Sequence, residues 1–274
     1  MASLDEGAIQ QSLNDAVSAR LTGLEVLAEI DSTNSYLMQY QGPPPGQVRV
    51  VVTDNQTRGR GRHGRTWQSP PGSGLCLSLA YTFAQQPTNL SALTLALGLG
   101  AIDALECLGV TGVQLKWPND LVANDGKLGG ILTETQAQRS GEITVVTGVG
   151  INIEIAEDLD FGIETDWARR VSDLADCMHE LPSRNVLAAG LIDGLGQTFF
   201  QYEASGFGSF IGKWQQRDWL LGRELTIDTP RRQVTGIGAG VADDGALLVD
   251  TGAGPHSRVT SGSVVMAGIR GAGK

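Results

Sequence analysis

A strand followed directly by an apolar helix constrains this fold more than any other sequence feature. From Leu75 to Phe83, large apolar residues alternate with small or polar ones, which is the period of a strand with one face in a core. The run from Asn89 to Leu108 is apolar on nearly all sides, so the helix that it predicts must be buried against a sheet. Asn89 offers a cap for this helix and Gly109 a stop. The chain therefore needs a sheet with a buried helix on it.

Other elements surround this pair along the chain. Strands are expected at 48–53, 113–117, 120–123, 127–135 and 143–153, and helices at 7–20, 32–40, 184–202 and 207–215. After about residue 220 the pattern changes to short strands separated by turns, which is typical of a small barrel. A segment this short is expected to have only marginal stability by itself, so we expect it to lean on the larger part. We therefore predict an α+β chain: a mixed β-sheet with helices over residues 1–220, and a small β-barrel over 221–270.

Composition excludes several classes of protein. Of the 274 residues, 41% are hydrophobic, which supports a buried core, and the net charge of −10 opposes broad binding of nucleic acid. The three cysteines and three histidines are scattered, so neither a disulfide framework nor a zinc site is predicted. Neither a signal peptide nor an uninterrupted apolar span long enough for a membrane is visible. We expect a soluble, cytoplasmic protein.

An arginine-rich loop is the sharpest local feature. Between Gln56 and Trp67, four arginines fall within eight residues and alternate with glycines, in a protein that is acidic overall. Arginine binds carboxylates and phosphates in a bidentate manner, and glycine lets the backbone approach a ligand closely. The loop predicts an anion clamp, although a solvated basic loop or a segment that contacts RNA explains it equally well. Its glycine pattern resembles a dinucleotide-binding loop, but no helix follows, and no P-loop is present.

A hairpin is predicted between the strands at 120–123 and 127–135. Asp125-Gly126 is a strong signal for a two-residue turn, which would place Asp120 opposite Ile131. The residues that would then share one face are Asp120, Val122, Lys127 and Gly129. A lysine on such a face can stabilise charge on an acyl or phosphoryl oxygen, and Asp120 with Asn119 can position a metal or polar substrate atoms. The alternative is an ordinary hairpin whose charged side chains face water.

Two glycines interrupt the apolar strand expected at 143–153. Gly148 and Gly150 weaken a strand, so they indicate a bulge or a place where a ligand needs space. Tight packing between the strand and a helix is an equally good explanation. The sequence alone does not decide between the two.

These blocks together resemble biotin–protein ligases. In the order and spacing of that family, the chain carries Ser32-Thr33-Asn34, Gln56 with residues 59–67, residues 116–120 with 127–132, and residues 148–152. The resemblance extends from about Asp31 to the C-terminus. It implies a catalytic domain related to class II aminoacyl-tRNA synthetases and lipoate ligases, followed by an SH3-like barrel.

The resemblance also implies a reaction in two steps. The carboxylate of biotin attacks the α-phosphate of ATP, with Mg²⁺, giving biotinyl-5′-AMP and pyrophosphate. The ε-amine of one lysine on a biotin carboxyl carrier domain then attacks the mixed anhydride and releases AMP. Such chemistry needs positioning and charge cancellation rather than a protein nucleophile. The residues implied to act in catalysis are Lys127 and Arg62.

Binding roles follow from the same resemblance, position by position. Biotin is expected to contact Ser32, Thr33, Asn34, Gln56, Arg60, Gly61, Arg62 and Lys127. ATP is expected to contact Gly59, Arg60, Arg62, Arg65, Trp67, Asn119, Asp120, Lys127 and Asn152. Asp120 is the candidate ligand for Mg²⁺.

Two alternatives to this function stay open at this point. A lipoate–protein ligase would share the fold and the adenylate intermediate, and a nucleic-acid-binding module could use the arginine loop. Only about 30 residues precede Ser32, fewer than the winged helix of family members that repress transcription, so we expect no DNA binding. The oligomeric state is left open.

Overall fold

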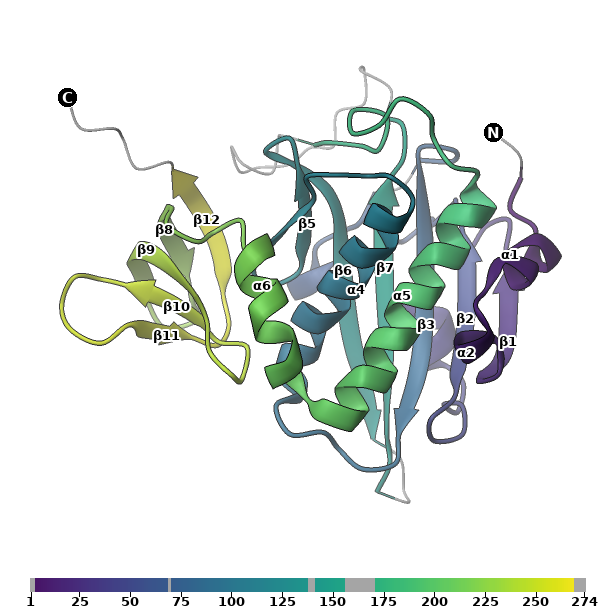
Figure 1. Cartoon of the computed structure of the whole chain (residues 1–274), viewed down its shortest axis with the longest axis horizontal. Coiled ribbons are helices and arrows are strands. Elements are labelled where there is room, and N and C mark those ends of the chain that lie inside the picture. Colours follow the sequence, from purple (N-terminus) through teal and green to yellow (C-terminus); the bar gives the residue numbers. More distant parts are fainter. Residues whose placement is uncertain (1–2, 69, 138–140, 156–170, 269–274) are drawn as a thin grey trace.

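A seven-stranded mixed sheet forms the larger part of the molecule (Figure 1). The structure is a computed structural model that describes residues 3–68, 70–137, 141–155 and 171–268. The strand order is β1-β2-β3-β7-β6-β5-β4, and all neighbours are antiparallel except β1 and β2. The strands are β1 (Leu21–Val26), β2 (Val48–Thr53), β3 (Gly74–Phe83), β4 (Gln114–Lys116), β5 (Asp120–Ala123), β6 (Gly126–Ala137) and β7 (Ile143–Asn152). The predicted strands are confirmed, with small shifts in their bounds.

The alternating pattern of β3 separates the two faces of this sheet. Leu77 and Leu79 lie in the main core, beneath the helices α4 (Leu93–Cys107) and α5 (Arg184–Ser205), which cover one face (Figure 1). Ser78 points to the opposite face, where its hydroxyl lies within hydrogen-bond distance of the Thr33 hydroxyl and the Asn34 side-chain oxygen, both on α3 (Thr33–Met38). One face is therefore closed by long helices, whereas the other carries α3 and remains available for a site.

The apolar helix α4 is a core helix. The segment Leu90–Cys107 is long and apolar enough to cross a membrane by length and composition alone, but 67% of it is buried within the protein. It lies very close to α5, because a Cβ atom at Gly100 would stand 2.7 Å from the backbone oxygen of Gly194. Glycine at this crossing allows close helix packing, and the prediction of a buried helix is confirmed.

Three details of the predicted helices differ in the structure. The expected helix at 7–20 is instead α1 (Glu6–Ser12) and α2 (Asp15–Ser18), because the Asn14 side chain accepts from the Val17 N–H and begins a second helix. Asn89 does not cap α4, since its amide donates to the carbonyl of Asp243 and a 3₁₀ turn precedes the helix. The last predicted helix appears as a 3₁₀ turn, Phe207–Phe210, followed by α6 (Ile211–Arg217).

A separate antiparallel sheet forms the C-terminal part (Figure 1). Its order is β11-β10-β9-β8-β12, which is consistent with an SH3-like domain. The strands are β8 (Glu224–Asp228), β9 (Gln233–Val241), β10 (Leu247–Asp250), β11 (Ser257–Val259) and β12 (Ser263–Gly268). The part leans on the larger sheet as expected, since the Trp117 indole N–H donates to the Gly245 carbonyl at 3.0 Å.

Candidate active site

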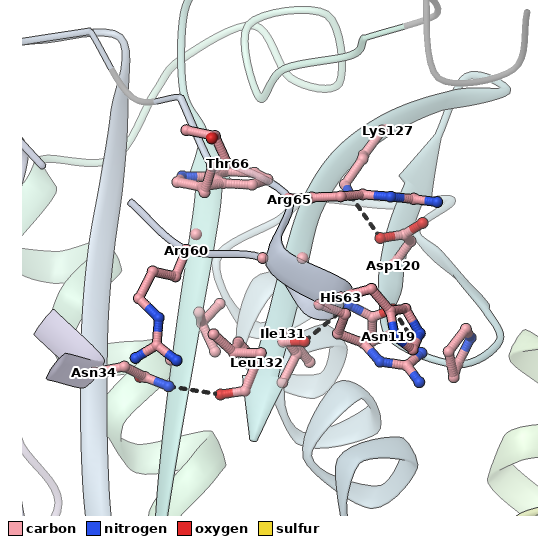
Figure 2. A pocket seen from close by; sticks show the side chains of 18 of the residues that line it. Asn34, Arg60, His63, Arg65, Thr66, Asn119, Asp120, Lys127, Ile131 and Leu132 are labelled. Carbon is pink, nitrogen blue, oxygen red and sulfur yellow. Dashed lines mark hydrogen bonds and ion pairs between the residues drawn. The ribbon is translucent and has the colours of Figure 1, made fainter. Parts of the chain in front are cut away.

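A cavity of about 200 Å³ lies on the α3 face of the large sheet (Figure 2). It brings together all but two of the predicted site residues. Those that line it are Ser32, Thr33, Asn34, Gln56, Arg60, Gly61, Arg62, Arg65, Trp67, Asn119, Asp120 and Lys127. They come from the N-terminus of α3, the arginine-rich loop, β5 and β6, which are far apart along the chain.

The other two predicted residues, Gly59 and Asn152, are not among the described residues that line the cavity. A Cβ atom at Gly59 would lie 2.3 Å from the backbone oxygen of Trp67, so this glycine lets the loop close at its base. The Asn152 amide donates to the backbone oxygens of Lys127 and Ser172, each at 3.1 Å. Gly59 therefore supports Trp67, and Asn152 supports Lys127, both of which line the cavity.

The hairpin that carries the central charges differs in register from the prediction. Asn124 and Asp125 form the turn, with φ of 50° and 54°, and Ala123 pairs with Gly126. A bulge then follows in the pairing, so Asp120 lies opposite Gly130. Asn and Asp tolerate this left-handed conformation, as a two-residue hairpin turn requires.

The bulge nevertheless brings the two predicted charges together. The Lys127 ammonium lies 2.7 Å from an Asp120 carboxylate oxygen (Figure 2). Gly129 does not share their face, because a Cβ atom there would meet the buried Ile151 side chain, whereas one at Gly130 would lie 3.6 Å from the Lys127 nitrogen. The predicted face is confirmed for Asp120 and Lys127, and Gly130 takes the place predicted for Gly129.

Burial shifts the proton affinities of this charged cluster. It alone would raise the pKa of the Asp120 carboxyl, but Lys127 and Lys116 outweigh burial and hold this pKa below its ordinary value. Burial lowers the pKa of Lys116 to about 8, although Asp120 opposes the shift. Burial also lowers the pKa of the Arg62 guanidinium. The cavity therefore holds cations in a poorly solvated place, which favours an anionic ligand.

The arginine-rich loop, residues 58–67, folds over the cavity as a flap. Its two legs pair at Arg60 and Thr66, and the Gly61 N–H donates to the Arg65 carbonyl at 2.7 Å. The Arg62 guanidinium points inward to the Asn119 side-chain oxygen, at 3.4 Å. The flap therefore presents a cation to the cavity, and the anion-clamp interpretation fits this geometry better than a solvated loop does.

A network of uncharged polar groups forms the far end of the cavity. The Thr33 N–H donates to the Gln56 side-chain oxygen at 2.9 Å, and the Ser78 hydroxyl donates to the Asn34 side-chain oxygen at 2.6 Å. The Asn34 amide in turn donates to the Leu132 carbonyl at 3.1 Å (Figure 2). Thr33, Asn34 and Ser78 are buried and all of these side chains are held by hydrogen bonds, so they can recognise a neutral polar ring without a large loss of side-chain entropy.

The two glycines of β7 make room for side chains of the site. A Cβ atom at Gly150 would stand 2.4 Å from the Trp67 ring, and one at Gly148 would stand 2.4 Å from the Asn34 side-chain oxygen. Both substitutions would displace a residue that lines the cavity. At Gly148 the alternative of close packing between the strand and a helix is therefore correct, since Asn34 belongs to α3, whereas at Gly150 the missing side chain leaves space for the Trp67 ring.

Several residues of the cavity wall carried no predicted role, among them Lys116 and the segment 262–265. Lys116 lines it and is only 5% exposed, with its ammonium 3.5 Å from the Val264 carbonyl. The sequence did offer a signal for the burial of Lys116, because this lysine lies between the apolar residues Leu115 and Trp117. The segment 262–265 of the C-terminal part also lines the cavity, and nothing in its sequence indicated this.

The charged end offers one carboxylate to a metal ion. Among the described residues, no group of three or more His, Cys, Asp or Glu side chains could hold a metal. Mg²⁺ usually binds through one or two carboxylates together with substrate phosphates and water. Asp120 beside Asn119 fits that pattern, in which the substrate supplies most of the ligands.

Both parts of the chain match families of known proteins. Residues 26–152 match the biotin/lipoate A/B protein ligase family, and residues 220–266 match the biotin protein ligase C terminal domain. The biotin--[acetyl-CoA-carboxylase] ligase of Mycobacterium tuberculosis is 32% identical over 270 residues, covering 96% of this chain and 95% of that protein. The bifunctional ligase/repressor BirA of Escherichia coli is 33% identical over 225 residues, covering 82% of this chain and 68% of that protein.

A solved structure with the same fold supports this match. The biotin protein ligase from Aquifex aeolicus in complex with biotin and ATP superposes with a TM-score of 0.72 and 26% identity, covering 89% of this chain and 97% of that one. The likeness therefore includes both the large sheet and the C-terminal part. The chain belongs to the biotin protein ligase family.

Proposed function

We propose that this chain is an ATP-dependent biotin–protein ligase that transfers biotin to a lysine of a carrier domain. One observation carries the proposal: a single cavity joins a neutral polar end, built around Asn34, to a cationic end, built around Lys127. Biotin has a neutral ring system at one end and a carboxylate at the other. The cavity offers complementary chemistry at both ends of such a molecule.

The polar end would hold the ring system of biotin. Ser32, Thr33, Asn34 and Gln56 supply hydroxyl and amide groups there, and Arg60 and Gly61 also line the cavity. Polar groups that are already fixed by other hydrogen bonds bind with little reorganisation. The carboxylate of the bound molecule would then extend toward Lys127.

The cationic end would support the first half-reaction. The carboxylate oxygen of biotin attacks the α-phosphorus of ATP, the bond to the bridging oxygen breaks, and pyrophosphate leaves. Lys127 and Arg62 would hold the two anions together and neutralise the charge that develops on the α-phosphate. Exclusion of water by the flap would then protect the acyl-adenylate from hydrolysis.

The nucleotide would lie between the flap and the C-terminal part. Trp67 offers a ring for the adenine to contact, and Arg65 lies beside Ser263, with 3.3 Å between guanidinium nitrogen and hydroxyl. Asn119 and Asp120 lie where phosphates would meet Mg²⁺, which would cancel phosphate charge when bound. Gly59 and Asn152 would act indirectly, by supporting Trp67 and Lys127.

The second half-reaction needs a protein partner. Two curated relatives, from Mycobacterium tuberculosis and Paracoccus denitrificans, carry the name biotin--[acetyl-CoA-carboxylase] ligase, which supports a biotin carboxyl carrier domain as the acceptor. The ε-amine of its lysine would attack the carbonyl carbon of the adenylate, lose a proton and release AMP. We place this reaction in the cytoplasm. We assign catalysis chiefly to residues 1–220 and a covering role to residues 221–270.

The direct test combines the purified chain with biotin, ATP, Mg²⁺ and a biotin carboxyl carrier domain. We expect the mass of one carrier lysine to rise by one biotinyl group, with one AMP and one pyrophosphate formed per transfer. Lipoate supplied in equal amount should compete poorly. A preference for lipoate, or the absence of ATP-dependent transfer, would contradict the proposal.

A further inference from the structure

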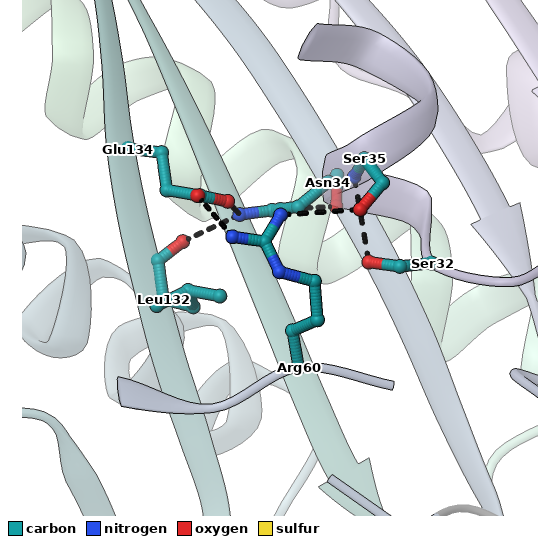
Figure 3. Close-up of polar contacts among 7 residues, drawn as sticks. Ser32, Asn34, Ser35, Arg60, Leu132 and Glu134 are labelled. Atoms are coloured by element: carbon teal, nitrogen blue, oxygen red, sulfur yellow. Dashed lines mark hydrogen bonds and ion pairs between the residues drawn. The ribbon is translucent and has the colours of Figure 1, made fainter. Parts of the chain in front are cut away.

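Glu134 connects the flap to the wall of the cavity. It lies on β6 beyond Leu132 and is not among the described residues that line the cavity. One of its carboxylate oxygens lies 2.5 Å from an Arg60 guanidinium nitrogen, and the other accepts from the Asn34 amide at 3.0 Å (Figure 3). A single side chain thus holds one residue of the flap and one residue of the polar end.

The same guanidinium is held from a second side. Its other terminal nitrogen donates to the Ser35 hydroxyl at 3.1 Å, in the first turn of α3, so Arg60 bridges β6 and α3 (Figure 3). The backbone of Arg60 also pairs with Thr66 across the flap. Fixing this one residue therefore fixes both legs of the flap over the cavity.

The chemistry of these contacts requires a carboxylate at position 134. The groups that face it, the Arg60 guanidinium and the Asn34 amide nitrogen, both donate hydrogen bonds. A carboxylate accepts with both of its oxygens, whereas the amide of glutamine accepts with one atom and donates with the other. A glutamine at this position would therefore satisfy one partner and oppose the other.

We propose that Glu134 is a positioning residue that latches the flap closed through Arg60. It acts on the site without touching the substrate, by slowing the opening through which biotin and biotinyl-5′-AMP leave. This role rests on the proposed function for the identity of the ligand, but the contact that it describes exists within the protein alone. Because the Arg60 side chain is 45% exposed, the effect is expected to be moderate.

Two measurements on Glu134→Gln test the latch. Without ligand, trypsin should cut the flap arginines several-fold faster than in the parent protein, as mapped by mass spectrometry of the fragments. With biotin bound, stopped-flow displacement should show dissociation that is about fivefold faster, which is the scale of one partly exposed ion pair. The parent and variant rates should converge at high salt, because salt screens the ion pair.

The chain offers a closely matched control in Glu25→Gln. The Glu25 carboxylate also accepts from an arginine and from a neutral donor, at 2.7 Å from Arg49 and 2.8 Å from the Tyr36 hydroxyl. Its side chain is 32% exposed, compared with 22% for Glu134, and it is not among the described residues that line the cavity. This control should change neither flap cleavage nor biotin dissociation.

Each outcome separates the latch from the proposed function. If the Glu134→Gln rates equal those of the parent or of Glu25→Gln, the latch is wrong even where biotin binds and reacts. Slower dissociation would show that Glu134 instead restrains Arg60 from the ligand, which also overturns the latch. If the parent binds no biotin, the proposed function fails while trypsin still tests the latch.

A second variant tests the same contact from the other side. Arg60→Gln removes the ion pair from its more exposed partner, so it tests the contact even where Glu134→Gln fails to fold. Adding Glu134→Gln to Arg60→Gln should accelerate flap cleavage little further, because the interaction is already lost. Fully additive effects would contradict a role through Arg60.

Discussion

At the scale of single residues, the site depends on glycines, which have no side chain, as much as on the polar residues that line the cavity. Gly148 and Gly150 leave the space that Asn34 and Trp67 occupy. The family blocks predicted nearly all of the residues around the cavity, because each block carries a distinctive set of side chains. They could not show that Gly59 and Asn152 act on neighbours, since that depends on where the folded chain directs each group.

Lys127→Ala provides the test at this scale. We expect formation of biotinyl-5′-AMP to fall at least about a hundredfold, because a donor at a developing anionic charge has effects of this size. The circular dichroism spectrum should not change, since the backbone of β6 keeps its pairing on both sides. The measurement is pyrophosphate release with biotin and ATP and without carrier.

Lys213→Ala is the matched control for this variant, because Lys213 also pairs with an aspartate, at 2.8 Å from Asp103. Its activity should equal that of the parent. An unfolded Lys127→Ala protein would show that the role of Lys127 is structural, and the assignment would then be wrong.

At the scale of secondary structure, one turn decides how the charges of Asp120 and Lys127 meet. Both Asn124-Asp125 and Asp125-Gly126 suit a two-residue hairpin, so local sequence could not choose between them. A tertiary contact distinguishes these two turns. Gly126 is the first residue of β6, and Ser172 packs so closely against it that a Cβ atom at Gly126 would lie 3.0 Å from Ser172. The strands of the large sheet other than β1 were predicted, because alternation and β-branched residues are local signals, whereas β1 (Leu21–Val26) was missed.

Asn124→Ala and Asn124→Gly measure what this turn contributes. Asn124 has φ of 50°, which alanine adopts at a penalty of about 1 kcal/mol and glycine adopts freely. Both variants lose the hydrogen bond from the Asn124 amide to the Asp176 carbonyl, so that loss cancels in the comparison. We expect urea unfolding to show Asn124→Ala less stable than Asn124→Gly by about 1 kcal/mol. Equal stabilities would argue against the left-handed turn.

At the scale of the whole molecule, the junction between the two sheets combines a shared apolar core with buried polar groups. Asp218 is buried there, where its carboxylate accepts from the Trp214 indole N–H at 3.2 Å and from the Leu220 N–H at 2.9 Å. The neighbouring Trp219 N–H donates to the Leu115 carbonyl of β4. The sequence predicted that the C-terminal part would lean on the larger one, but this contact surface has no local pattern.

Asp218 should make stability depend on pH. Burial raises its pKa to about 6, although hydrogen bonds from Leu220 and Trp214 oppose the shift. Between the ordinary value of 3.8 and about 6, the folded state binds a proton that the unfolded state has lost, so stability falls as pH rises. Relative to Asp218→Asn, the parent should lose about 1 kcal/mol of unfolding free energy between pH 5 and pH 7.5.

Urea titrations of both proteins at several pH values measure this difference. Other carboxyl groups titrate alike in the two proteins, so they cancel. A gap that stays constant over this pH range would show that Asp218 titrates normally.

The segment 262–265 has a broader consequence, since it contributes one wall of the reaction chamber from a different sheet than the one that bears the lysine. Under the proposed function, the large sheet and the C-terminal sheet would together shield the acyl-adenylate from water. Under the same proposal, a fragment that ends before β8 would keep Lys127 and Arg62 but would release biotinyl-5′-AMP to the solvent more readily than the full chain does.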